Sequence, residues 1–404
     1  MVLSTLDDRP VYELKTTAAV LGSYDEAMER ARALKPKLRE RVAETEQRRH
    51  LPPENVADIL ESGLYGLMTP KRFGGSQLGP ETMIDVTIEL ASACPSTGWV
   101  HMLWTAHMWM LAQFPLSAQE ELWSNPNSLA SSVVNTVGDV VPVDGGYRWT
   151  GRGFFSSGVD HCNWLTAAVP IKRPEVDGPP EMRWLLIPRE DFVIVDDWFT
   201  VGLKGTGSKT IVLDEIFIPQ SRTLVGKEVE EGIAPGHQVH SDPMYGAISW
   251  ANFTAAMAAP ALGVARGFLA AYEDRLRSKS SNIDDGLTVN MARYANAAAM
   301  VDAAHALTLQ NAERYARVPA REVGRDIRGK CRRDQAFTAQ SARKAVNTLY
   351  EECGGSGLYD GSDLQRLWRD TNAAAAHNGL TNDWIAVGST KTLLGVPSDP
   401  RFLF

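Results

Sequence analysis

Hydrophobic and polar positions in the first part of the chain alternate with the period of amphipathic helices. Residues 25–49 carry Ala and Leu at helical spacing among charged residues, which predicts a helix with one buried face. Residues 51–67 have prolines near their start and glycines near their end, an asymmetry typical of helices. Residues 81–93 form another amphipathic run. We therefore expect a helical N-terminal part.

The segment 96–114 (STGWVHMLWTAHMWMLAQF) is apolar and approaches the length of a membrane span. It has no formal charge, but it contains His101, His107 and Gln113. The centre of a bilayer penalises such polar groups. We therefore predict a buried helix of a soluble protein, with Trp99, Trp104 and Trp109 in its core.

The pattern changes at about residue 128 and changes back at about residue 245. Between 128 and 222, short apolar runs rich in Val, Ile, Trp and Thr are separated by Gly and Pro, which predicts the strands of a barrel or sandwich. Residues 223–244 are rich in Gly, Pro and charge and are expected to be a connecting loop. Ala-rich helices follow at 251–277, 286–317, 330–352 and 362–376. The expected domains are 1–124, 125–225 and 226–404.

Composition and charge exclude several classes of protein. Hydrophobic residues make up 44% and charged residues 22% of the 404 residues, which is typical of a globular chain. The net charge of −8, without a basic block, disfavours binding to nucleic acid or to an anionic membrane. The four cysteines form no C-x-x-C pair, so no metal site is expected. The N-terminus lacks an apolar signal core, and we expect a cytoplasmic protein with free thiols.

Common catalytic motifs are missing from the sequence. There is no G-x-G-x-x-G after a predicted strand, no G-x-S-x-G and no H-E-x-x-H, and KGTGSKT lacks the order of a phosphate-binding loop. Taken singly, His107 and His377 read as ordinary core histidines. The pattern alone therefore predicts a soluble protein with helical, β and helical parts, but no chemistry.

Four segments in this order resemble the acyl-CoA dehydrogenase fold. They are SGLYGLMTPKRFGG, VDGGYRWTGRGFFSSGVDHCNWLTAAV, VGLKGTGSKTIVLDEIFIP and CGGSGLYDGSDLQRLWRD. The resemblance covers nearly the whole chain. It implies an α+β fold with an N-terminal helical domain, a central small β-barrel and a C-terminal four-helix bundle.

Dehydrogenases of this fold need a carboxylate that removes a substrate proton. Its expected position, after Arg369-Asp370, is occupied here by Asn378, and an amide cannot act as a base. FFSSGVDHCNW, with Phe155 where a Trp is usual, instead resembles a segment of two-component flavin monooxygenases. ACPSTGWV followed by His107, and AAAAHNG with His377, resemble their active-site segments. Members of this branch include 4-hydroxyphenylacetate hydroxylases, hydroxylases of steroid degradation and indole-oxidising enzymes.

This resemblance implies a reaction of reduced flavin (FADH2 or FMNH2) with O2, through a flavin C4a-hydroperoxide, that hydroxylates a phenol, indole or polycyclic substrate. The catalytic residues would be His377 as a base, His107 as a second choice or substrate donor, and Ser157. The residues expected at the cofactor are Ser132, Ser156, Ser157, Arg275, Arg277, Gly354 and Gly355. The substrate pocket would contain Trp99, His107 and Asn378.

The same resemblance implies partners. No nicotinamide-binding fingerprint is visible, so a separate NAD(P)H:flavin reductase would supply the reduced flavin, and the chain would form a homotetramer or a homodimer. An acyl-CoA dehydrogenase-type oxidoreductase, an N-oxygenase of an amino sugar and a non-catalytic flavin-binding protein stay open as alternatives. So does the choice between FAD and FMN, and the question of whether Ser156 or Ser157 faces the flavin.

Overall fold

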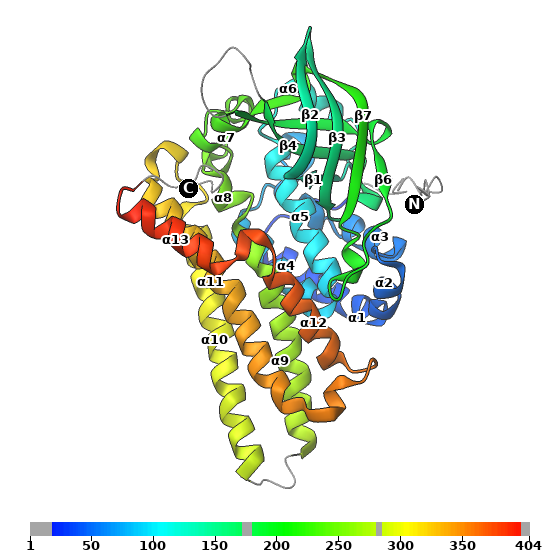
Figure 1. Cartoon of the computed structure of the whole chain (residues 1–404), viewed down its shortest axis with the longest axis vertical. Coiled ribbons are helices and arrows are strands. Elements are labelled where there is room, and N and C mark those ends of the chain that lie inside the picture. The colour runs from blue at the N-terminus through cyan, green and yellow to red at the C-terminus, as the bar shows by residue number, and fades with distance from the viewer. Residues whose placement is uncertain (1–17, 172–179, 280–284, 397–404) are drawn as a thin grey trace.

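The computed structural model describes residues 18–171, 180–279 and 285–396. Helices fill the N-terminal part, strands the centre and helices the C-terminal part (Figure 1). This confirms the predicted α+β architecture. The exact domain boundaries stay predictions. The strands gather at one end of the molecule, and the long C-terminal helices extend from the other end (Figure 1).

The N-terminal helices begin and end largely where local chemistry predicts. Ser23 caps the first helix by accepting the Glu26 N–H, and Pro80 and Pro95 occupy the first turns of two others, where a missing N–H costs nothing. These helices are α1 (Tyr24–Glu40), α2 (Val42–Arg48), α3 (Pro53–Ser62), α4 (Pro80–Ala93), α5 (Pro95–Leu111) and α6 (Leu116–Leu122).

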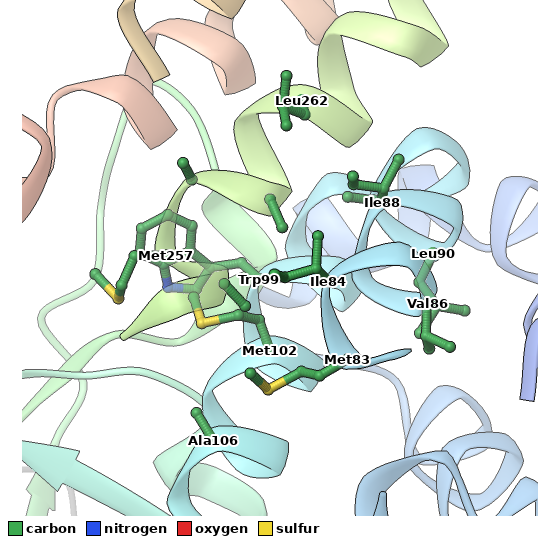
Figure 2. Close-up of a cluster of buried hydrophobic side chains, with 14 of the residues drawn as sticks. Met83, Ile84, Val86, Ile88, Leu90, Trp99, Met102, Ala106, Met257 and Leu262 are labelled. Carbon is green, nitrogen blue, oxygen red and sulfur yellow. The ribbon is translucent and has the colours of Figure 1, made fainter. Parts of the chain in front are cut away.

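Helix α5 is the buried helix predicted at 96–114, since all but one of its seventeen residues are buried. It packs closely on α4, because a Cβ on Gly98 would lie 2.5 Å from the Ala91 Cα. Trp99 and Met102 of α5 join Met83 and Ile84 of α4 and Met257 from the C-terminal part in one apolar cluster (Figure 2). The core therefore runs continuously from the N-terminal to the C-terminal helices.

The central part consists of two four-stranded sheets, ordered β1-β4-β5-β8 and β2-β3-β7-β6. Only the β1–β4 pair is parallel among these strands. Apolar residues from both sheets, such as Trp149, Leu165 and Ile211, share one core. The strands are β1 (Ala130–Val133), β2 (Asn135–Val143), β3 (Gly146–Ser156), β4 (Trp164–Ile171), β5 (Glu181–Pro188), β6 (Val193–Val195), β7 (Lys209–Pro219) and β8 (Thr223–Val225).

The segment 223–244 differs from the expected connecting loop. It contains β8 and the short helix α7 (Gly226–Glu231), which ends at the left-handed Gly232. Strand β8 forms because β5 offers it a free edge, with Trp184 opposite Leu224. That edge comes from a distant part of the chain, so the local composition carried no sign of it.

The C-terminal helices follow the predicted Ala-rich segments closely. Helices α9, α10, α11 and α12 pack on one another, and α13 is a further helix that the pattern did not predict. One helical stretch, Ala255–Ser278, is long and apolar enough to cross a membrane, but 78% of its apolar window is buried, as in a core helix. The helices are α8 (Ser249–Asn252), α9 (Ala259–Lys279), α10 (Asp285–Tyr315), α11 (Arg325–Tyr350), α12 (Asp363–Ala375) and α13 (Asn382–Leu393).

His101 on α5 is a structural histidine. It is fully buried, with Nδ1 3.2 Å from the Thr87 hydroxyl and Nε2 3.1 Å from the Leu64 carbonyl. A neutral ring satisfies both contacts, accepting from Thr87 and donating to Leu64. Burial lowers the pKa of His101 to about 4, so the folded protein holds this ring in its neutral form.

This burial predicts a loss of stability in mild acid. On unfolding, the pKa of His101 returns from about 4 to 6.5, so the unfolded chain binds the extra proton first, and stability falls as the pH drops below that value. Between about pH 7 and about pH 5, His101 should remove about 2 kcal/mol from the free energy of unfolding. Urea denaturation of wild type and His101→Gln at both pH values tests this. Equal pH slopes for the two proteins would contradict it.

Candidate active site

A chain of buried hydroxyl groups joins α5 to the β-domain. The Trp99 Nε1–H donates to the Ser157 hydroxyl over 3.1 Å. The Ser157 and Ser208 hydroxyl oxygens are 2.6 Å apart, and those of Ser208 and Thr206 are 2.7 Å apart. The Thr206 hydroxyl then donates to the Leu203 carbonyl over 3.0 Å. The residues between β6 and β7 are thereby tied to helix α5.

The direction of this chain follows from counting protons. A hydroxyl has one proton to donate and two lone pairs that accept. Because the Thr206 proton goes to the Leu203 carbonyl, Ser208 must donate to Thr206, and Ser157 must donate to Ser208. Ser157 accepts one hydrogen bond from Trp99. One lone pair on the Ser157 oxygen is therefore left to accept a hydrogen bond from a ligand.

Ser156 points the other way. Its side chain is fully buried, and its hydroxyl oxygen is 2.8 Å from that of Ser131, which also donates to the Ser157 carbonyl. Ser131 lies on the same face of β1 as Val133, a residue of the β-domain core. Ser157, and not Ser156, therefore presents its hydroxyl to the helices.

Backbone geometry explains this arrangement. Phe155 has φ 65° and Gly158 has φ 70°, so the two serines lie between left-handed residues. The pairing of β3 with β7 is irregular between Gly153 and Ser156, and such bulges re-aim side chains. A Cβ on Gly158 would lie 2.8 Å from the Trp104 Nε1, so only glycine fits there. Left-handed non-glycine residues are costly and concentrate at functional sites.

His107 carries an unused acceptor. Its Nδ1 is 2.6 Å from the Ala130 carbonyl and donates to it, while its Nε2 is buried and has no partner in the part of the chain that the structure describes. Burial lowers the pKa of His107 to about 4, so the ring is neutral and Nε2 carries the lone pair. The ring lies 5.8 Å from that of Phe253, which in turn is 5.6 Å from Trp184. This acceptor therefore lies among aromatic side chains.

The centre of the His377 ring lies 5.7 Å from that of the Trp99 ring. Its Nδ1 accepts the Gly379 N–H over 3.0 Å. Loss of water around the ring and the positive charge of Arg332 lower the pKa of His377 to about 4, although the residue as a whole is exposed. The ring is neutral near about pH 7 in either environment, so its proton is on Nε2.

Asn378 follows His377 in a short turn and is exposed. It carries no acidic group to take the dehydrogenase role. Ser132 is half-buried and adjoins Ser131 in β1, so the two side chains leave opposite faces of the strand. The structure thus brings Trp99, Ser157 and His377 together, with Ser132 on the outer face of the nearby strand β1.

The remaining predicted cofactor residues form a separate cluster. Arg275 on α9 donates to the Cys353 carbonyl and to the Ser356 hydroxyl, both over 3.0 Å, and so holds the loop that contains Gly354 and Gly355. Gly354 has φ 57°, which favours glycine, and a Cβ on either glycine would meet nothing within 4 Å. Arg277 pairs instead with Glu273.

Several site residues were missed by the sequence analysis. Ser131, Thr206 and Ser208 complete the hydroxyl networks, and buried Asp370 accepts the Leu203 N–H over 2.6 Å. KGTGSKT, which contains Thr206 and Ser208, was considered only as a phosphate loop. Its hydroxyls at alternate positions are the available signal, but only the fold shows that Ser208 contacts Ser157 and that Thr206 contacts Ser208.

Comparisons with known proteins agree with this geometry. Residues 26–126 match the family described as acyl-CoA dehydrogenase, N-terminal domain, and residues 255–382 match acyl-CoA dehydrogenase, C-terminal domain. The chain is 34% identical to the FADH(2)-dependent resorcinol hydroxylase, oxygenase component, of Rhizobium sp. (strain MTP-10005), over 89% of this chain and 91% of the relative.

Two solved structures are similar over nearly the whole chain. The 3-HSA hydroxylase from Rhodococcus sp. RHA1 has a TM-score of 0.88 at 33% identity, covering 93% of this chain and 99% of that one. XiaF from Streptomyces sp., in complex with FADH2 and glycerol, has a TM-score of 0.83 at 27% identity, covering 93% and 98%. The chain therefore belongs to the oxygenase components of the two-component flavin-dependent monooxygenases, which have the acyl-CoA dehydrogenase fold.

Proposed function

We propose that this chain hydroxylates an electron-rich aromatic substrate that bears a hydrogen-bond donor, such as a phenol or an indole. The proposed site has Trp99 and Ser157 at its cofactor end and His107, about two turns further along α5, at its substrate end. A separate reductase supplies the reduced flavin. The observation that carries this proposal is a pair of unused acceptors: one lone pair on Ser157 and the buried Nε2 of His107. One suits the cofactor and the other suits the substrate.

The residues around Ser157 fit a reduced flavin. When bound, reduced flavin supplies the electrons that activate O2 for transfer of one oxygen atom. Its ring carries an N5–H donor, which the free lone pair of Ser157 is able to accept. Trp99, only 6% exposed, gives this site an apolar wall that excludes water, and Ser157 adds no charge. Ser132 on the outer face of β1 is a further proposed flavin contact.

Arg275, Arg277, Gly354 and Gly355 are proposed to bind the flavin beyond its ring. Arg275 is already bonded to the glycine loop, so it contributes by holding that loop in shape. The side chains of Leu358 and Tyr359 just beyond the loop are 68% and 74% exposed. Such apolar exposure suits contact with another subunit, and we propose a homo-oligomer, most simply a homotetramer or homodimer, in which this loop meets a neighbouring chain.

The two histidines are proposed to have complementary roles. His107 offers an acceptor to a substrate O–H or N–H, because its Nε2 has no partner among the residues that the structure describes. Since burial lowers its pKa to about 4, we assign it the role of a hydrogen-bond acceptor and not of a base. His377 was the first choice as base from the sequence, but its Nδ1 already accepts from Gly379, so it offers an Nε2–H donor instead. A donor at the substrate oxygen stabilises its anion, and the anion is the electron-rich form that oxygen transfer requires.

The acyl-CoA dehydrogenase alternative has no support in these residues. Asn378 is an amide, and the nearby carboxylate of Asp370 is buried and bonded to the Leu203 backbone. We further propose a cytoplasmic location. The four cysteines are buried thiols, as expected in a reducing compartment.

Rapid mixing of the protein and reduced FAD or FMN with oxygen tests the proposed function. We expect a transient flavin spectrum that differs from both the reduced and the oxidised forms, and hydroxylated product when a phenol or indole is present. If neither flavin gives such a transient and no aromatic is oxygenated, the proposal is wrong. Bleaching of oxidised flavin by an acyl-CoA without oxygen would support the dehydrogenase alternative.

Ser157→Ala and Ser156→Ala form a matched pair. Removing the Ser157 hydroxyl deletes the proposed acceptor for the cofactor, so reduced-flavin binding should weaken by about tenfold, the usual value of one such hydrogen bond. Removing the Ser156 hydroxyl breaks a contact inside the β-domain and should lower the free energy of unfolding by about 1 kcal/mol without that loss of binding. Anaerobic flavin titration and urea denaturation measure both. Equal effects on binding would contradict the assignment.

Glutamine distinguishes the histidine roles, because it donates and accepts hydrogen bonds but cannot take up a proton. His107→Gln and His377→Gln each keep a hydrogen-bonding group and should stay within about tenfold of wild type, whereas His107→Ala and His377→Ala should fall further. Single-turnover product yields at saturating reduced flavin measure this. If His377→Gln fails as completely as His377→Ala while His107→Gln is active, the base is His377.

A further inference from the structure

We propose that Asp370 is a positioning residue that holds Leu203 in a left-handed conformation, and thereby fixes the hydrogen-bond direction that leaves Ser157 an acceptor, and not a donor, toward the bound cofactor. This inference rests on the proposed function, because it assigns a consequence to the contact between Ser157 and flavin. Its structural half, the hold of Asp370 on Leu203, is testable without flavin.

Leu203 is the strained point of the segment between β6 and β7. It has φ 50° and ψ 36°, the left-handed region that residues with a Cβ avoid. Its side chain is 5% exposed, so packing in the core holds Leu203 in place and the turn cannot rearrange freely. A conformation of this kind persists only where the surroundings hold it.

The surroundings hold both polar groups of the Leu203 backbone. The Asp370 carboxylate on α12 accepts its N–H over 2.6 Å. The Trp198 Nε1–H and the Thr206 hydroxyl donate to its carbonyl over 3.2 and 3.0 Å. Asp370 is 3% exposed, so no water replaces it readily. It is therefore the side chain that fixes this turn from the helical domain.

The Leu203 carbonyl is also the end of the hydroxyl chain. While it faces Thr206, it takes the Thr206 proton, and the protons of Ser208 and Ser157 are committed in turn. If Leu203 relaxes to a right-handed or extended conformation, its carbonyl turns away and the Thr206 proton is released. The donor and acceptor roles along the hydroxyl chain can then reverse. Ser157 gains a proton to donate at the place where a reduced flavin must be protected from stray protons.

Burial raises the pKa of Asp370 to about 6, against the opposing influence of the Leu203 N–H and of Arg366. The carboxyl is therefore mostly ionised near about pH 7, which strengthens its hydrogen bond to the Leu203 N–H. The same helix adds a second link, because the Arg369 guanidinium donates to the Val201 carbonyl over 2.5 Å. Both links bind α12 to the segment that carries Leu203.

Hydrogen exchange measured by mass spectrometry on the flavin-free protein tests the structural half. Asp370→Ala should speed amide exchange at residues 202–206 by about tenfold or more, because the acceptor of the Leu203 N–H is lost. Asp370→Asn keeps an oxygen acceptor without the charge and should exchange much closer to wild type than Asp370→Ala does. Asp363→Asn, on the same helix with its side chain 73% exposed, is the matched control. Unchanged exchange in Asp370→Ala would overturn the proposal.

The consequence is tested by the coupling, which is the fraction of oxidised flavin that yields hydroxylated product instead of hydrogen peroxide. Asp370→Ala and Ser208→Ala should each lower that fraction several-fold, and the double variant should be no worse than Ser208→Ala, because both act through the same proton. Additive losses, or faster exchange with unchanged coupling, would overturn the proposal. Failure of Ser157→Ala to affect flavin binding would instead count against the proposed function.

A second variant guards against a folding failure. Leu203→Gly accepts the left-handed conformation without strain, so in that background Asp370→Ala should lose less coupling than it does in wild type. The change in coupling between the two backgrounds reports positioning, whereas thermal unfolding reports stability alone. An equal loss of coupling in both backgrounds would contradict a role through Leu203.

Discussion

The hydrogen bond from Trp99 to Ser157 is the contact on which the site depends. It is the point where the most buried helix of the N-terminal part meets the end of a strand in the β-domain. Trp99 is held by the apolar cluster of α4, α5 and Met257. Ser157 is held by the left-handed turns on either side of it. Each half of the site is thus positioned by its own domain. The hydrogen bond between Trp99 and Ser157 fixes the position of one domain relative to the other.

Several polar groups at the site are already engaged in hydrogen bonds within the protein. The Ser157 proton is committed to Ser208, the His107 proton to the Ala130 carbonyl, and the His377 lone pair on Nδ1 to Gly379. What is left open is one acceptor on Ser157, one acceptor on His107 and one donor on His377. These three groups are uncharged and have defined hydrogen-bond polarity, and the positive charge of Arg332 acts on His377 beside them. Such polarity suits the proposed reaction, which acidic protons would abort.

In the cluster around Arg275, two nearby arginines have different hydrogen-bond partners. The Arg275 guanidinium spans the Gly354–Gly355 loop, while Arg277, two residues later, is taken by Glu273 on the surface. Two arginines that look alike in sequence therefore differ in what they can bind. Gly354 adopts a left-handed conformation that suits glycine, and a Cβ there would meet nothing within 4 Å.

The sequence by itself determined the element types, because helical and strand periodicities are local, and it determined the family, because Ser156-Ser157-Gly158 and the segment ending in His377 are contiguous motifs. It named Trp99, Ser157, His107 and His377 as site residues. It did not reveal β8, whose partner edge lies forty residues away in β5, nor which of two adjacent serines faces the helices, since a single left-handed residue reverses that face. Only the tertiary structure brought Ser208, Thr206 and Asp370 to Ser157. Hydrogen-bond direction is a property of the whole chain of contacts, and that chain joins Trp99, Ser157, the segment 203–208 and Asp370, which are distant from one another in sequence.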